Sequence, residues 1–132
     1  MLILNHDGTT PIYMQIAQWL EMEILAGNIM ADEKVYSQYQ LAEMFNINPA
    51  TAAKGLNLLA DNQIVYKKRG LGMFVTEHAR EIILTKRKEK TLKKLIQELV
   101  AEAKRLHVND EELIKMIKLA RTKGDEKKND SC

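Results

Sequence analysis

The sequence predicts a mainly α-helical fold that contains one small β-hairpin. Apolar residues recur every three or four positions in five segments, which is typical of helices that bury one face. Capping residues stand before most of these segments, and two short β-prone runs flank a glycine-bearing turn. The 132 residues make about one domain with a small appended element. No apolar run approaches the roughly 20 residues that a membrane helix needs, so we expect no membrane partner.

The first helix is predicted to begin at Thr10 and Pro11. Threonine is a frequent cap, and proline is tolerated at the first helical position because its missing N–H would have no partner there. Gly27 and Asn28 end this helix. Its apolar stripe consists of Ile12, Ile16, Leu20 and Ile24, with Trp19 alongside.

A short second helix and a third helix follow. Ser37 and Gln40 stand three residues apart at the start of the second helix, which is the pattern of a capping box. Asn48 and Pro49 supply a cap and a first position for the third helix. One face of the third helix is predicted to be buried and consists of Ala52, Leu56 and Leu59. Another face presents Ala50, Ala53, Lys54 and Asn57.

Residues 64–66 and 73–75 are β-prone runs on either side of a turn. The segment 66–75 reads YKKRGLGMFV and places three cations and two glycines between the runs, which predicts a hairpin. A phosphate-cradling glycine loop is a weak alternative, because such a loop precedes a helix and has a different glycine spacing. The order helix, helix, short turn, helix, hairpin is the pattern of a winged helix-turn-helix, which we predict for residues 1–77.

Residues 78–120 form a predicted helical arm. One long helix and a final helix are separated at 107–109, where Asn109 and Glu112 make another cap-like pair. Two amphipathic helices lack the third layer that closes a core, so we expect them to bury their stripes against a second copy of the chain. The residues of this homodimerisation stripe are Leu92, Leu95, Ile96, Leu99, Ala103, Leu106, Leu113 and Ile117. Residues 121–132 lack apolar content and are predicted to be a flexible polar tail.

The distribution of charge says more about partners than the net charge of +2. Residues 1–76 carry five Lys or Arg and seven Asp or Glu, whereas the rest of the chain carries fifteen and eleven. Three of the five cations in the first part are Lys67, Lys68 and Arg69 of the hairpin. A nucleic-acid partner therefore has to be argued from where the cations lie.

No residue pattern supports an enzyme. His6, His78 and His107 are scattered, and Cys132 has no base partner nearby in the sequence. The chain has no HExxH or CxxC motif and no paired metal-ligand spacing, so we expect no catalytic residue, cofactor or metal. A single cysteine that cannot form an internal disulfide favours a reducing, cytoplasmic location.

Short motifs in register between about residues 10 and 76 carry a resemblance to a known family. They are PIYMQI at 11–16, LAG at 25–27, LAE at 41–43, INPAT at 47–51 and RGLGMFV at 69–75. In combination they resemble the GntR family of bacterial transcription regulators, and most closely its short YtrA-like subgroup. The resemblance implies a DNA-binding winged helix, and the arm is similar to the two helices that YtrA-like members have in place of a large ligand-binding domain.

The sequence departs from the family where arginine is common. Tyr39 replaces the usual DNA-contacting arginine of the second helix. Pro49 and Ala53 replace arginines of the third helix, which is the recognition helix of the family. Met73 replaces a family threonine in the wing. Because arginine bidentate to guanine is the commonest specific base contact, the family's base preference transfers weakly. The residues that do match are Ser37, Thr51, Gly70 and Gly72.

In this fold the N-terminal part of the third helix lies in the major groove. Ala50 and Ala53 suit thymine methyl groups and Asn57 could pair with adenine, so we expect contacts rich in A·T. Close packing or helix propensity explains the alanines equally well. Ser37 could donate to a phosphate, act only as a cap, or do both. The predicted DNA-binding residues are Ser37, Tyr39, Asn48, Ala50, Thr51, Ala53, Lys54, Asn57, Lys67, Lys68, Arg69, Gly70 and Gly72.

Taken together, the sequence predicts a dimeric repressor that occupies a promoter by binding an inverted repeat in double-stranded DNA. The resemblance to YtrA-like regulators implies an ABC-transporter operon as a target and leaves any small-molecule effector unknown. The alternative is a winged-helix protein-interaction module that does not bind DNA by itself. The acidic first half and the missing arginines favour that alternative.

Overall fold

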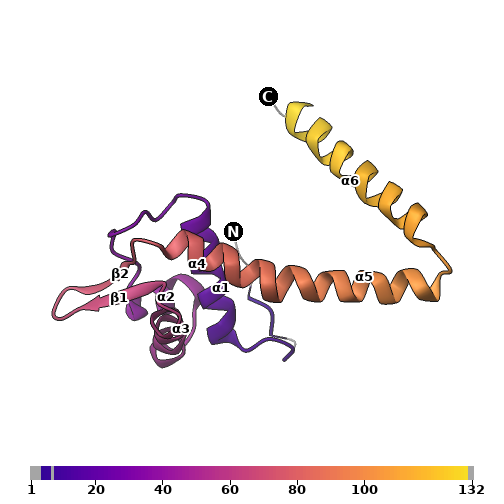
Figure 1. The fold of residues 1–132 in the computed structure, drawn as a ribbon. Coiled ribbons are helices and arrows are strands. Elements are labelled where there is room, and N and C mark those ends of the chain that lie inside the picture. Colours follow the sequence, from indigo (N-terminus) through magenta and orange to yellow (C-terminus); the bar gives the residue numbers. More distant parts are fainter. Residues whose placement is uncertain (1–3, 7, 131–132) are drawn as a thin grey trace. The chain divides into compact units, whose positions relative to one another are not determined.

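The computed structural model of the chain describes residues 4–6 and 8–130, with side chains described up to residue 124. The chain divides into two compact units, Met1–Arg87 and Lys88–Cys132 (Figure 1). The first unit has a core to which all of its helices and both strands contribute. Its most deeply buried side chains include Ile16, Leu20, Leu41, Leu59, Ile64, Val75 and Ile83. Within the described residues, every helix is too short or too polar to cross a bilayer.

Helix α1 (Ile12–Leu25) buries Ile16, Leu20 and Ile24, as its four-residue spacing predicts. The prediction that Thr10 caps this helix is wrong, because Pro11 stands at the N-cap and no side chain caps the helix. The Thr10 carbonyl instead accepts a hydrogen bond from Gln15 Nε2 at 2.9 Å. The predicted stop is confirmed, since Gly27 has a φ of +82° just after the helix.

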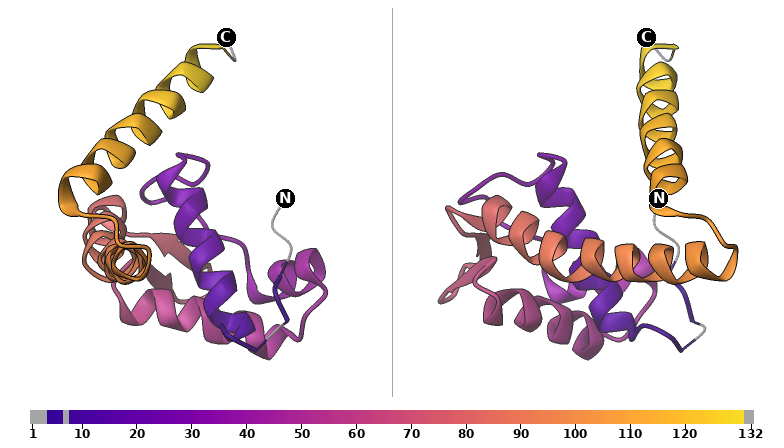
Figure 2. Two further views of the ribbon diagram at one scale, coloured as in Figure 1. Left: turned by 90° about the vertical axis from the view of Figure 1, so that its right-hand side faces the viewer. Right: turned by 45° about the vertical axis from the view of Figure 1, so that its right-hand side comes forward.

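Helices α2 (Gln38–Phe45) and α3 (Pro49–Asp61) are capped as predicted. Ser37 and Gln40 form a reciprocal capping box before α2. The side chain of Asn48 accepts a hydrogen bond from the Ala50 N–H at 2.8 Å at the start of α3. Both α1 and α2 pack against α3, and Figure 2 shows the three helices gathered into one bundle. Trp19 of α1 packs against Phe45 of α2 with ring centroids 5.0 Å apart, and lies 5.9 Å from Tyr36.

The hairpin consists of antiparallel strands β1 (Val65–Lys68) and β2 (Gly72–Val75), with Val65 opposite Val75 and Lys68 opposite Gly72. It projects beyond the three helices (Figure 1). The preceding segment 32–35 lies along β2, which the sequence did not predict. Val35 N–H donates to the Met73 carbonyl and Val75 N–H donates to the Glu33 carbonyl, both at 2.9 Å. The wing therefore has a third, edge segment that contains Lys34.

After the hairpin the chain is helical in four successive elements: α4 (Ala79–Lys86), the π-helical segment η1 (Arg87–Leu92), α5 (Lys93–Arg105) and α6 (Asp110–Asp130). The predicted arm begins at residue 78, whereas the structure divides the chain after Arg87. The reason is that α4 buries Ala79 and Ile83 in the core of the first unit.

The predicted break between the last two helices is confirmed. His107 has a φ of +58°, and Asn109 Oδ1 accepts a hydrogen bond from the Glu112 N–H at 2.9 Å. The segment predicted as a flexible tail, 121–132, is helical up to Asp130, and its last two residues lie outside the described part. The segment contains an arginine and three lysines, which are good helix formers and favour the continuation of α6.

Candidate nucleic-acid interface

Helix α3 presents a face of small and polar side chains to solvent. Asn48, Ala50, Lys54 and Asn57 are exposed, and Thr51 and Ala53 are half-buried. The opposite face is buried in the core. The structure therefore brings together all six residues that the sequence assigned to this helix and its cap, with no large apolar side chain among them.

Lys54 is held in a defined place on this face. Its Nζ lies 4.2 Å from the centre of the Tyr13 ring of α1, which is the geometry of a cation–π contact. Such a contact reduces the number of conformations of the long side chain without removing its charge. Lys54 therefore presents an ordered positive charge beside Ala50 and Asn57.

The N-terminus of α2 carries Ser37 and Tyr39. Ser37 Oγ accepts from the Gln40 N–H at 3.1 Å, and Gln40 Oε1 accepts from the Ser37 N–H at 2.8 Å. The Ser37 hydroxyl proton is not used in this capping box, so the hydroxyl can still donate to an anion at the helix N-terminus. Tyr39 is 68% exposed, so a large aromatic ring lies in solvent two residues after the cap.

The tip of the hairpin is a tight turn of glycines and cations. The Leu71 N–H donates to the Lys68 carbonyl at 2.9 Å, which closes the loop around Arg69 and Gly70. Gly70 and Gly72 have φ values of +79° and +110°, a region that glycine adopts without strain. The two glycines are therefore required by the turn itself, whatever else they contact.

The wing cations differ in their surroundings. Lys67, Lys68 and Arg69 are all exposed. Lys68 Nζ lies 4.5 Å from the centre of the Phe74 ring, whereas Lys67 follows the strand alternation to the opposite face of the hairpin. Cations therefore project from both faces of the wing and from its tip.

Lys34 is a fourth cation at the wing, and the sequence analysis did not assign it to the interface. It pairs with Phe74 in an isolated bridge, and its Cε lies 2.9 Å from where a Cβ on Gly72 would stand. Lys34 is exposed. Its distance in sequence from the hairpin explains why periodicity could not reveal this position.

Potential metal ligands are not gathered in the part of the chain that the structure describes. No group of three or more His, Cys, Asp or Glu that could hold a metal ion occurs among the residues that were placed. His78 is an exposed side chain, and its Nδ1 lies 3.7 Å from Glu81 Oε2. Such a surface pair is typical of a solvated helix start.

Most of the stripe predicted for dimerisation is exposed in the single chain. Ala103 is buried and Leu113 is half-buried, whereas the other six residues are between 41% and 65% exposed. Those six residues are Leu92, Leu95, Ile96, Leu99, Leu106 and Ile117. An apolar stripe of this kind leaves helices α5 and α6 without the cover that amphipathic helices require.

Comparisons with known proteins agree with the fold. The family model "Bacterial regulatory proteins, gntR family" matches residues 12–75. The chain is 32% identical over 132 residues to the HTH-type transcriptional repressor YtrA of Bacillus subtilis (strain 168). The match covers 98% of this chain and 100% of that protein.

Two solved structures are similar as well. A GntR family transcriptional regulator from Listeria monocytogenes is 28% identical with a TM-score of 0.68, covering 85% of this chain and 96% of that one. The protein BusR of S. agalactiae, solved with its busAB-promotor DNA, is 30% identical with a TM-score of 0.55, covering 87% of this chain and 58% of that one.

The similarities agree with the winged helix and with the short helical region that follows it. The chain belongs to the GntR family of bacterial transcription regulators, in its YtrA-like subgroup, and is not an enzyme.

Proposed function

We propose that this chain is a dimeric repressor that binds an inverted-repeat operator. The observation that carries the proposal is the grouping, in one compact unit, of the exposed face of α3, the N-terminus of α2 and a basic wing. A helix face of small polar residues fits the major groove, and lysines and an arginine on a projecting hairpin fit the phosphate backbone.

Helix α3 reads bases and the other elements fix its register. Ala50 and Ala53 contact thymine methyl groups, and Asn57 pairs with adenine, so the operator is rich in A·T at these positions. Lys54 contacts a phosphate or a base edge. Ser37 donates to a phosphate, and the wing cations contact the backbone and the adjacent minor groove.

Two copies of the chain pair through the apolar stripe of α5 and α6. Six residues of that stripe are at least 41% exposed in the single chain, and pairing removes them from water. A two-fold axis between the copies relates the two α3 helices, so the operator has two half-sites in opposite orientation. Repression follows from occupation of a promoter.

The physiological target is an operon for an ABC transporter, as the resemblance to YtrA-like regulators implies. Binding to chromosomal DNA fits the cytoplasmic setting expected from cysteine usage.

A winged-helix protein-interaction module is the second candidate. Tyr39, Pro49 and Ala53 stand where the family commonly has arginine, and residues 1–76 carry a net charge of −2. Both observations weaken the attraction to DNA, and neither affects the fold.

A selection from random-sequence DNA distinguishes the two candidates. Full-length protein is incubated with the library at low salt, and bound DNA is amplified and sequenced over several rounds. Enrichment of an inverted repeat, together with a dimer in analytical ultracentrifugation, supports the repressor. The interaction module is identified if a folded dimer enriches no sequence. In that case the protein should also cause no mobility shift of the DNA upstream of its own gene.

A further inference from the structure

Glu21 is a buried carboxylate on a helix whose neighbouring residues are apolar. It lies on α1 between the core residues Leu20 and Ile24, and only 2% of its side chain is exposed. A carboxylate removed from water is unfavourable unless cations or hydrogen-bond donors surround it. Glu21 is not among the residues of the interface described above, so the reason for its burial has to be found in its own surroundings.

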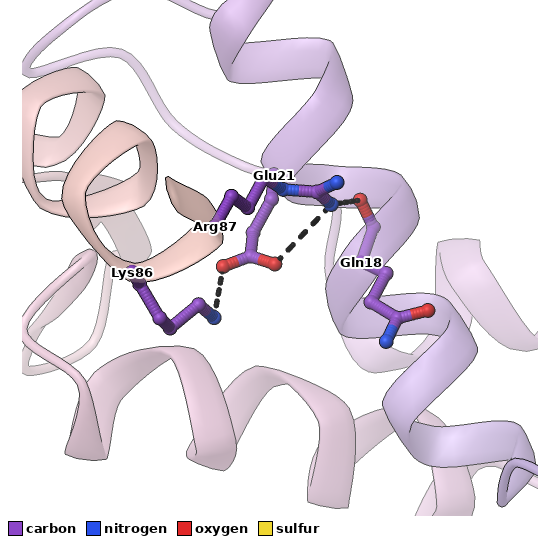
Figure 3. A network of polar contacts seen from close by, with 4 residues as sticks. All are labelled: Gln18, Glu21, Lys86 and Arg87. Atoms are coloured by element: carbon purple, nitrogen blue, oxygen red, sulfur yellow. Dashed lines mark hydrogen bonds and ion pairs between the residues drawn. The ribbon is translucent and has the colours of Figure 1, made fainter. Parts of the chain in front are cut away.

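Lys86 and Arg87 meet the two oxygens of this carboxylate from consecutive positions of the chain (Figure 3). Lys86 Nζ forms an ion pair with Glu21 Oε2, and Arg87 Nη2 lies 3.5 Å from Glu21 Oε1. Arg87 Nη2 also donates to the Gln18 carbonyl at 3.2 Å. The guanidinium therefore contacts two positions of α1 that are nearly one turn apart, which holds it in orientation as well as in place.

These contacts lie where the helix stops packing on the first unit. Lys86 is the last residue of α4 and Arg87 is the first residue of η1. Ile83, one turn earlier, is fully buried, whereas every residue from Lys88 to Glu102 is exposed. The Glu21 network, which consists of Gln18, Glu21, Lys86 and Arg87, therefore marks the exit of the chain from the first unit.

The other end of α4 is attached to α1 independently. Arg80 Nη1 donates to the Leu25 carbonyl at the end of α1, and Ala79 is buried beside it. Loss of the Glu21 carboxylate therefore frees the end of α4 that continues into the arm and leaves the start of α4 in place.

The π-helical segment η1 makes the exit sensitive to small changes. Such segments occur mostly as single turns within α-helices and are frequent at functional positions. Because successive residues of a helix differ by about 100°, one residue more or less in this turn rotates the apolar stripe of the arm to another side. The Glu21 network holds Arg87, the first residue of that turn.

We propose that Glu21 is a positioning residue that fixes, through Lys86 and Arg87, the direction in which the arm leaves each DNA-binding unit. It thereby sets the half-site spacing that the dimer accepts. This inference rests on the proposed function of a dimer that binds an inverted repeat. In such a dimer, the separation and rotation of the two α3 helices follow from the exit direction of the two arms. One base pair rotates a half-site by roughly 35° about the duplex, so a firm exit rejects neighbouring spacings.

The test compares Glu21→Gln and Glu21→Met with the wild-type protein and with Glu23→Gln. Glu23 is two residues away on the same helix, where it accepts a hydrogen bond from Asn28 Nδ2 at 2.9 Å, so the control removes the same charge outside the network. Both Glu21 substitutions nearly preserve side-chain volume, and thermal unfolding checks that each variant is folded. The probes are the inverted repeat selected by wild-type protein, the same repeat with one or two base pairs added or removed between half-sites, and a single half-site.

We expect a one-base-pair change of spacing to weaken wild-type and Glu23→Gln binding about tenfold, and to weaken binding of the Glu21 variants about threefold or less. Affinity for the single half-site should be the same for all four proteins. Glu21 variants with the wild-type spacing profile, or with an equal loss on every probe including the half-site, overturn the inference alone. Failure of the wild-type protein to select any inverted repeat overturns the proposed function and this inference with it.

Discussion

Gly55 lies so close to α1 that a Cβ at this position would stand 2.8 Å from the Tyr13 carbonyl oxygen. The contact is between backbones, because Gly55 is buried in the middle of α3 and Tyr13 is in the first turn of α1. It fixes how closely the two helices approach. Tyr13 also carries the cation–π contact with Lys54, so the same approach positions a charge on the exposed face.

We expect Gly55→Ala to destabilise the protein by about 1–3 kcal/mol, because backbone atoms cannot move aside as a flexible side chain can. The better helix propensity of alanine offsets only about 1 kcal/mol of this. Gly124→Ala is the matched control, since a Cβ there has no neighbour within 4 Å. Chemical denaturation of both variants measures the difference, and equal stability of the two would contradict the close backbone contact.

Two substitutions of Ser37 separate its capping role from a phosphate contact. Ser37→Ala removes the cap and should lower the free energy of unfolding by about 1 kcal/mol. Ser37→Asp keeps a good cap, so stability should stay within about 0.5 kcal/mol, but it places a negative charge toward the proposed phosphate. DNA binding by the aspartate variant should fall about tenfold or more at low salt. Unchanged affinity in the aspartate variant would leave Ser37 with the capping role alone.

Lys67→Gln should reduce the slope of log affinity against log salt concentration by about one unit, because one phosphate contact is lost. Fluorescence polarisation at a series of salt concentrations measures the slope. Lys115→Gln removes the same charge from an exposed position of α6 and should leave the slope unchanged. A common decrease in both variants would show that net charge, and not the wing, governs the salt dependence.

Tyr39→Arg should raise DNA affinity, since an exposed arginine at the N-terminus of α2 adds a cation where the proposed complex places the phosphate backbone. The side chain is 68% exposed, so the substitution should not affect folding. An increase in the salt slope of about one unit identifies a phosphate contact. Tyr39→Leu is the companion variant, and a weaker complex in that case indicates that the tyrosine itself contacts DNA.

Leu99→Glu should convert the proposed dimer to a monomer, because it places a charge within the apolar stripe of α5 where Leu99 is 41% exposed. Sedimentation velocity measures the oligomeric state. Gln97→Glu introduces the same side chain at a nearby exposed position of the helix and should leave the dimer intact. A Leu99→Glu protein that remains dimeric would remove the stripe from the interface.

Features governed by local interactions could be predicted from the sequence. The capping box of Ser37 and Gln40 and the Asn48 cap join groups two or three residues apart, so the side chains that form them are visible as a short pattern. The hairpin was predictable for the same reason, since its two strands are joined by one glycine-bearing turn. The residues of α3 and of the hairpin therefore lie on the elements that the sequence predicted for them.

Features that depend on distant residues could not be predicted in this way. The segment with Lys34 pairs with β2 across the intervening α2 and α3, and no periodicity connects the two. From the sequence alone, Glu21 is a polar residue of an amphipathic helix. Its burial follows from contacts with Lys86 and Arg87, which are distant in the sequence. The sequence predicts that the arm begins at residue 78, whereas the structure divides the chain after Arg87. The difference arises because Ile83 of α4 packs in the core of the first unit, a contact that the sequence pattern does not indicate.

The aromatic cluster of Trp19, Tyr36 and Phe45 makes the two halves of the chain optically distinct. Trp19 is the single tryptophan of the sequence, and no tyrosine or phenylalanine follows Phe74. Intrinsic fluorescence therefore reports only on the DNA-binding unit, whereas far-ultraviolet circular dichroism reports on the arm as well. Following both signals during one thermal scan separates melting of the arm from melting of the winged helix without any label.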